Sequence, residues 1–207
     1  MENSIDFISI KKGNPNKAII AIHGWQGNKT SFNFLSDLMK VNDVEWFFPE
    51  APYILNNNND TRSWSFETSP GIYDVQKTKN QLPVFFNDHV FSKYQSENVF
   101  ILGFSQGAII CFEFALNMKT KLGAVFPIAG TFRDQDVEKP RFHPAQKNTP
   151  IVIGHGKDDD VIDIKYSRKI YKILKNQKAN VKLIEFNGGH KINLQYLKEI
   201  TKLINES

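Results

Sequence analysis

The feature that most constrains this chain is a pentapeptide, Gly103-Phe104-Ser105-Gln106-Gly107, set between two apolar segments. The segment before it, Val99–Leu102, has the character of a buried strand, and the segment after it, Ala108–Leu116, has the character of a helix. A sharp turn from strand to helix brings the backbone close to itself on both sides of the serine, so the flanking residues must be small. A serine that merely capped the helix would leave both glycines unexplained. The pentapeptide therefore predicts an exposed nucleophile, Ser105, at the carboxyl end of a sheet.

Short apolar segments alternate with longer segments of helical periodicity along the chain, which is typical of a mostly parallel sheet with helices on both faces. The predicted strands are Ile5–Ile10, Ala18–Ile22, Val44–Phe48, Val99–Leu102, Ala124–Ile128, Ile151–Ile153 and Val181–Phe186. The predicted helices are Ser31–Met39, Asp74–Tyr94, Gln106–Asn117, Ile164–Lys178 and Asn193–Asn205. A length of 207 residues favours a single domain, 1–207. Two long irregular stretches, 51–73 and 130–148, are expected to border the active site, because long loops in a compact domain tend to be functional.

A serine hydroxyl needs a base to take its proton, and in folds of this type the chain order is nucleophile, acid, histidine. His190 follows the last predicted strand in Asn187-Gly188-Gly189-His190, where two glycines let the loop turn back toward Ser105. We therefore predict that His190 is the base. The other histidines are His23, for which a structural role is expected, His155, expected to hydrogen-bond the backbone, and His89 and His143.

The acid is expected in the loop after Ile151–Ile153, where four carboxylates lie within six residues. Asp159 is favoured as the buried partner of the histidine, Asp158 is the alternative, and Asp163 is expected to cap the next helix. A metal site is the rival interpretation of this cluster. It is not favoured, because the cluster lacks the glycine and the distal glutamate of an EF-hand loop.

Acyl transfer also needs hydrogen-bond donors for the developing oxyanion. One predicted donor is the backbone N–H of Gln106, directly after the nucleophile. The other should come from the loop after an early strand, and there we predict the N–H of Trp25.

The charge and the chain's segments restrict the possible partners. The chain has 26 Lys and Arg against 22 Asp and Glu, a formal charge of +4, but the positive residues are scattered over solvated helical faces, so no nucleic-acid partner is expected. A single cysteine, Cys111, excludes an internal disulfide and favours a reducing compartment. Neither a signal sequence nor an apolar run of about 18 residues is found. We therefore expect a cytoplasmic protein without a stable membrane anchor.

These motifs resemble those of the α/β-hydrolase superfamily, and within it the phospholipase/carboxylesterase family that includes the acyl-protein thioesterases. The resemblance covers about residues 18–204 and rests on His23-Gly24, Pro49-Glu50-Ala51-Pro52, Arg62-Ser63-Trp64, Gly103-Phe104-Ser105-Gln106-Gly107, His155-Gly156-Lys157-Asp158-Asp159 and Gly189-His190. It implies that Asp159 is the acid and that Trp64 lines the active-site cleft. The sequence departs from the family at Gln26-Gly27-Asn28, where a glycine-aspartate pair is common, and at Ser65, which delays a phenylalanine to Phe66.

Together these observations predict an α/β-hydrolase fold and a serine hydrolase, without cofactor or metal, that cleaves esters or thioesters of small or acyl-chain substrates. Ser105 would carry the acyl group, with His190 as base and Asp159 as its orienting acid. Aromatic residues that could line an apolar acyl pocket, or else pack in the core, are Trp25, Trp64, Phe66, Tyr73 and Phe132. A peptidase or amidase with the same triad and an inactive binding protein on the same scaffold stay open as alternatives.

Overall fold

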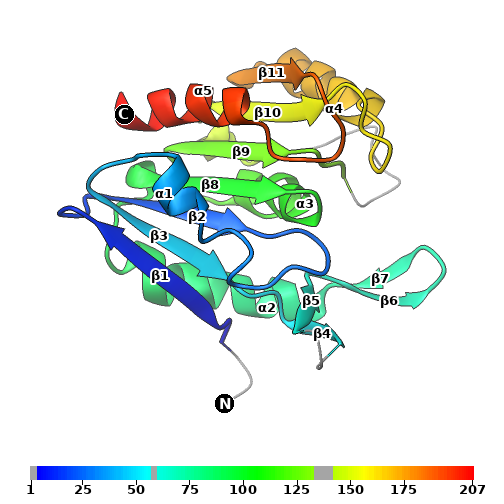
Figure 1. Cartoon of the computed structure of the whole chain (residues 1–207), viewed down its shortest axis with the longest axis horizontal. Coiled ribbons are helices and arrows are strands. Elements are labelled where there is room, and N and C mark those ends of the chain that lie inside the picture. Colours follow the sequence, from blue (N-terminus) through cyan, green and yellow to red (C-terminus); the bar gives the residue numbers. More distant parts are fainter. Residues whose placement is uncertain (1–3, 57–59, 133–141) are drawn as a thin grey trace.

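The computed structural model describes residues 4–56, 60–132 and 142–207. Its centre is a seven-stranded sheet in the order β1-β3-β2-β8-β9-β10-β11 (Figure 1). The strands are β1 (Phe7–Lys12), β2 (Lys17–Ile22), β3 (Val44–Pro49), β8 (Val99–Phe104), β9 (Ala124–Ile128), β10 (Ile151–Gly156) and β11 (Val181–Phe186). β1 pairs antiparallel with β3, and all other neighbours in this sheet are parallel. All seven predicted strands are confirmed, with ends that differ by at most three residues.

Helices cover both faces of the sheet. α2 (Gln76–Phe85), α3 (Gln106–Glu113) and α4 (Lys165–Asn176) lie on one face, and α1 (Leu35–Leu38) and α5 (Leu194–Asn205) lie on the other (Figure 1). Each face closes its own cluster of buried side chains, and successive residues of β8 alternate between them: Ile101 belongs to the first cluster, and Phe100 and Leu102 belong to the second. This alternation explains why the central strands are apolar on both faces. No helix in the described part of the chain is long and apolar enough to cross a membrane.

Two predicted helices agree with α4 and α5 to within two residues, whereas the other three are shorter or interrupted. Of the helix predicted at Ser31–Met39, only Leu35–Leu38 is helical. The helix predicted at Gln106–Asn117 consists of α3 followed by a short 3₁₀ turn, η3 (Ala115–Asn117). The long helix predicted at Asp74–Tyr94 divides into α2 and a π-helix, η1 (Phe86–Phe91). Pro83 near the end of α2 has no N–H to donate, which weakens the regular hydrogen-bond pattern there. Further 3₁₀ turns are η2 (Ser96–Asn98) and η4 (Pro144–Gln146).

The prediction that 51–73 is irregular is wrong. This stretch forms two small antiparallel hairpins that project from one edge of the fold (Figure 1). They are β4 (Tyr53–Asn56) with β5 (Thr61–Ser63), and β6 (Phe66–Ser69) with β7 (Ile72–Asp74). Strands of only three or four residues have too few positions for an apolar pattern to show. Of the second stretch, 130–148, the part 133–141 lies outside the described residues.

Candidate active site

Ser105 occupies the turn between β8 and α3. Its backbone angles, φ 54° and ψ −114°, are ones that residues with a side chain rarely adopt. The backbone is so close on both sides that a Cβ at Gly103 would lie 2.2 Å from the Gly107 carbonyl oxygen. A Cβ at Gly107 would lie 2.2 Å from the carbonyl oxygen of Ile22 in β2. The two glycines are therefore required by the turn, and the turn holds Ser105 in place at the carboxyl end of the sheet.

The three residues predicted for the triad lie in contact. Nε2 of His190 is 3.0 Å from Oγ of Ser105, and Nδ1 of His190 is 2.8 Å from Oδ2 of Asp159. Each residue follows one strand of the parallel sheet, namely β8, β10 or β11, so the shared direction of these strands brings them to one edge. The ring of Phe104 packs against the His190 ring with 4.8 Å between centroids.

Asp159 is held as an acceptor on both of its oxygens. Its side chain is fully buried, and Oδ1 accepts the amides of Val161 at 2.9 Å and Ile162 at 2.8 Å. Burial by itself would raise the pKa of Asp159, but the Ile162 amide, His190 and the Val161 amide together hold it below its usual value. A buried carboxylate that stays ionised is suited to orient an imidazole and to stabilise its protonated form.

The neighbouring aspartates have other partners. Asp158 accepts the Gly188 amide at 3.3 Å, and Asp160 is exposed. Asp163 accepts the Lys165 amide at 2.8 Å, at the first residue of α4, but the position directly before this helix is held by Ile164, which has no side-chain cap. It is thus Asp159, and not the alternative Asp158, that lies against the base. Within the described ranges, no group of three or more His, Cys, Asp or Glu side chains is arranged to hold a metal ion.

The loop after β2, which carries the second predicted oxyanion donor, passes close to the serine. Gly24 is packed so closely that a Cβ there would lie 3.2 Å from Cβ of Ser105. Trp25 follows Gly24, and Gln106 is the first residue of α3, where backbone N–H groups have no partner within the helix. The two predicted donors therefore belong to segments that flank the nucleophile on either side.

His23 controls the direction of the Trp25 N–H. Its Nδ1 lies 2.7 Å from the Gly24 carbonyl oxygen, and its Nε2 accepts the Ala51 amide at 3.1 Å, so the proton is on Nδ1. The Gly24 carbonyl and the Trp25 N–H belong to one planar trans peptide and point in opposite directions. The hydrogen bond that fixes the Gly24 carbonyl therefore also fixes the direction of the Trp25 N–H. Burial lowers the pKa of His23 to about 4, so the ring is neutral near pH 7.

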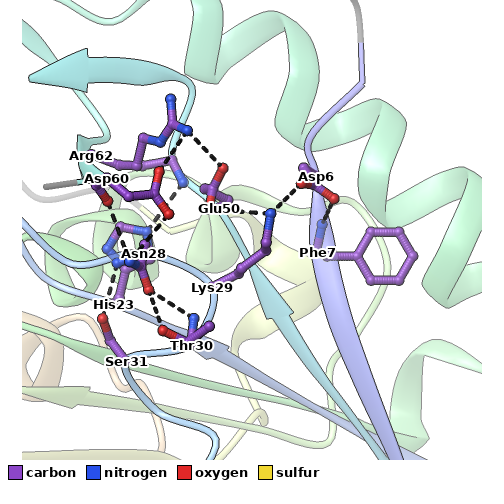
Figure 2. Close-up of polar contacts among 11 residues, drawn as sticks. Asp6, Phe7, His23, Asn28, Lys29, Thr30, Ser31, Glu50, Asp60 and Arg62 are labelled. Atoms are coloured by element: carbon purple, nitrogen blue, oxygen red, sulfur yellow. Dashed lines mark hydrogen bonds and ion pairs between the residues drawn. The ribbon is translucent and has the colours of Figure 1, made fainter. Parts of the chain in front are cut away.

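An ionic network anchors the same loop from behind (Figure 2). Glu50, only 8% exposed, faces Nζ of Lys29 at 3.6 Å and Nη2 of Arg62 at 3.4 Å. Lys29 also pairs with Asp6, and this contact raises the pKa of Lys29. The backbone N–H and carbonyl of Arg62 hydrogen-bond to the loop that carries Trp25. The loop is thus tied to β5 and to the start of β1 by charges as well as by backbone hydrogen bonds.

A pocket of about 530 Å³ opens beside the nucleophile. Its lining residues are Trp25, Leu55, Ser63, Ser65, Phe66, Glu67, Tyr73, Gln106, Ile109, Thr131 and Phe132. Four of the five aromatic residues predicted for an acyl pocket are among them, and they come from the loop after β2, the β6–β7 hairpin and the segment after β9.

The prediction that Trp64 lines the cleft is wrong. Its side chain has no exposed surface and packs in the core beneath α2, while its chain neighbours Ser63 and Ser65 line the pocket. The physical reason is that the indole N–H finds a buried acceptor in the His23 carbonyl oxygen, at 2.9 Å.

The side chain of Gln106 is a site feature that the sequence reasoning missed. Its Oε1 accepts the Trp64 amide at 2.9 Å, and its Nε2 donates to Oγ of Ser63 at 2.9 Å and to Oγ of Ser65 at 3.0 Å. The residue expected to supply an oxyanion donor is thereby tied to the wall of the pocket. The two hydroxyl residues on either side of Trp64 were the signal that could have indicated this contact.

The chain matches the model of the phospholipase/carboxylesterase family over residues 3–207. It is similar to acyl-protein thioesterase 1 of Kluyveromyces lactis, with 23% identity over 95% of this chain and 94% of the relative. It is also similar to carboxylesterase SOBER1 of Arabidopsis thaliana, with 25% identity over 80% of this chain and 78% of the relative.

Two solved structures have the same fold. They are Arabidopsis thaliana SOBER1, with TM-score 0.78 and 24% identity over 92% of this chain and 98% of that chain, and esterase PE8, with TM-score 0.84 and 18% identity over 98% and 99%. The sheet order, the covered faces and these likenesses identify the predicted α/β-hydrolase fold. The match spans almost the whole chain, and the protein therefore belongs to the phospholipase/carboxylesterase family of hydrolases.

Proposed function

We propose that the protein hydrolyses carboxylic esters or thioesters of acyl-chain substrates through an acyl-Ser105 intermediate. The observation that carries this proposal is the unbroken set of contacts from Oγ of Ser105 through His190 to the buried carboxylate of Asp159. The names of the relatives, acyl-protein thioesterase and carboxylesterase, support the same reaction class.

The positions of the side chains support the following reaction steps. Oγ of Ser105 attacks the carbonyl carbon while Nε2 of His190 accepts its proton, and Asp159 stabilises the charged ring. The N–H groups of Trp25 and Gln106 bind the oxyanion. The intermediate then collapses, the C–O or C–S bond breaks, and the leaving alkoxide or thiolate takes the proton from His190. Water then attacks the acyl carbon while Nε2 of His190 takes its proton; the bond between the acyl carbon and Oγ of Ser105 breaks, and His190 returns the proton to Oγ as the acid leaves.

The pocket beside Ser105 is suited to the acyl part of the substrate. Aromatic side chains line it, including Phe66 and Tyr73 of the β6–β7 hairpin and Phe132. Apolar walls combined with polar groups, here including Ser63, Ser65 and Glu67, are typical of sites that bury an apolar part of a ligand and orient a polar part.

The test is a matrix of substrates in which acyl length varies against three leaving groups: an aryl ester, a thioester and an anilide. We expect turnover of the first two, with kcat/KM increasing with acyl length until the pocket is filled. Faster cleavage of the anilides would favour the amidase alternative. Absence of turnover for the whole matrix would favour the inactive binding protein. Ser105→Ala is the control that reports uncatalysed hydrolysis.

A further inference from the structure

We propose that His155 is a positioning residue that holds the Asp159 carboxylate toward His190, an inference that rests on the function proposed above. His155 is a second histidine beside the acid, and the steps of the reaction do not use it. Its ring is completely buried at the carboxyl end of β10.

One carboxylate oxygen lies between two imidazoles. Oδ2 of Asp159 is 2.8 Å from Nδ1 of His190 and 3.2 Å from Nε2 of His155. Since both Asp159 and His155 have fully buried side chains, no solvent competes for this contact. The His155 ring therefore forms one wall of the space in which the carboxylate lies.

The neighbours of His155 determine which of its nitrogens carries the proton. Nε2 lies 2.7 Å from the carbonyl oxygen of Ile162, which can only accept, so Nε2 carries the hydrogen and donates it to this carbonyl, while the same nitrogen lies 3.2 Å from Oδ2 of Asp159. Nδ1 lies 2.7 Å from Oγ of Ser167 and accepts its hydroxyl hydrogen. Burial lowers the pKa of His155, although the Ile162 carbonyl and Asp159 act against that shift, so the ring is neutral. The neutral ring therefore lies beside the acid without a second positive charge and donates to Ile162, the residue whose amide binds the acid.

The ring also closes the loop that carries the acid. The Ile162 amide donates to Oδ1 of Asp159, and the carbonyl of the same residue accepts from His155, so the loop wraps around the ring. Ser167, buried in α4, lies 3.3 Å from the Gly130 carbonyl oxygen. The contacts therefore run from the acid through His155 and α4 to the segment after β9. Together they restrict both the backbone and the side chain of Asp159.

A matched pair of polar variants separates the donor from simple packing. In His155→Gln the side-chain amide nitrogen reaches the place of Nε2, whereas in His155→Asn it reaches only the place of Nδ1 and loses the donor to the Ile162 carbonyl, which fixes the loop that binds Asp159. We expect His155→Gln to keep kcat within about threefold, and His155→Asn to lose about 10- to 100-fold in kcat with KM changed less than about twofold, because small displacements of catalytic groups have effects of this size. Equal kcat values for the two variants would overturn the proposal.

A double-mutant cycle then tests whether His155 acts through Asp159. In the Asp159→Asn background, His155→Asn should lower kcat by less than about twofold, since the group it positions is already lost. A change that only weakens the fold would lower kcat by the same factor in both backgrounds, and that result would contradict the inference. If Asp159→Asn alone leaves kcat unchanged, the proposed triad fails, which is a distinct outcome. Should His155→Asn not fold, Ser167→Ala replaces it, with a kcat loss expected only when Asp159 is present.

Discussion

Replacement of Asp159 by asparagine should lower kcat by about 10⁴-fold, because the surrounding amides decide which way the new side chain points. Oδ1 of Asp159 accepts two backbone amides, from Val161 at 2.9 Å and Ile162 at 2.8 Å. The oxygen of an asparagine takes the same place, since the opposite orientation would turn its NH₂ group toward these two N–H donors and lose both hydrogen bonds, at a cost of about 1–2 kcal/mol.

The NH₂ group of that asparagine then faces Nδ1 of His190, which must accept a hydrogen bond where it had donated one. The proton of the neutral ring moves to Nε2, and a protonated Nε2 cannot take the hydrogen of Ser105. The geometry is kept while the tautomer is wrong, so kcat should fall and thermal unfolding should change little. The assay is steady-state hydrolysis of a short-chain aryl ester. Asp158→Asn and Asp160→Asn are the matched controls, and each should stay within about tenfold of wild type because these carboxylates are not buried against the base. An Asp159→Asn enzyme within tenfold of wild type would refute this reasoning.

Three further predictions concern stability and metal dependence. His23 has a pKa of about 4 in the folded protein and an ordinary value of 6.5, so below pH 6.5 the unfolded chain binds more protons, and the free energy of unfolding decreases as the pH is lowered. This group should remove about 3 kcal/mol of the free energy of unfolding between pH 7.5 and pH 4. Urea titrations that show no such decrease would contradict the assignment. Trp64→Ala should lower the free energy of unfolding by about 3–5 kcal/mol, whereas Trp25→Ala, at a residue 60% exposed, should have less than a third of that effect in the same titrations. Activity should survive prolonged dialysis against EDTA, because the serine, the imidazole and the backbone donors serve every step; activity lost and then restored by a divalent ion would show that a metal is required.

The central sheet and the contact of His190 with Ser105 and Asp159 could be predicted because both impose local patterns on the sequence. A buried parallel strand has to be apolar on both faces, and the segments before Ser105 and before the His155-Gly156 pair meet that condition. The turn at Ser105 leaves no room for side chains on either side of it, so the turn can be recognised in the sequence from Gly103 and Gly107.

What could not be predicted depends on contacts between segments distant in the chain. Trp64 is in the core because its indole meets the carbonyl of His23, which is 41 residues earlier. The contact between His155 and Asp159 depends on how one loop folds over its own strand, and a histidine next to a glycine does not reveal it. The hairpins of 51–73 pair few residues, so tertiary contacts rather than periodicity define them.

The most direct test of the account is active-site labelling with a fluorophosphonate probe, followed by mapping of the modified peptide. The account predicts one labelled residue, Ser105, with labelling abolished in Ser105→Ala and strongly slowed when His190 is replaced by alanine. Modification of a different serine, or an unchanged labelling rate in the His190→Ala variant, would contradict the claim that Ser105 is a nucleophile activated by His190.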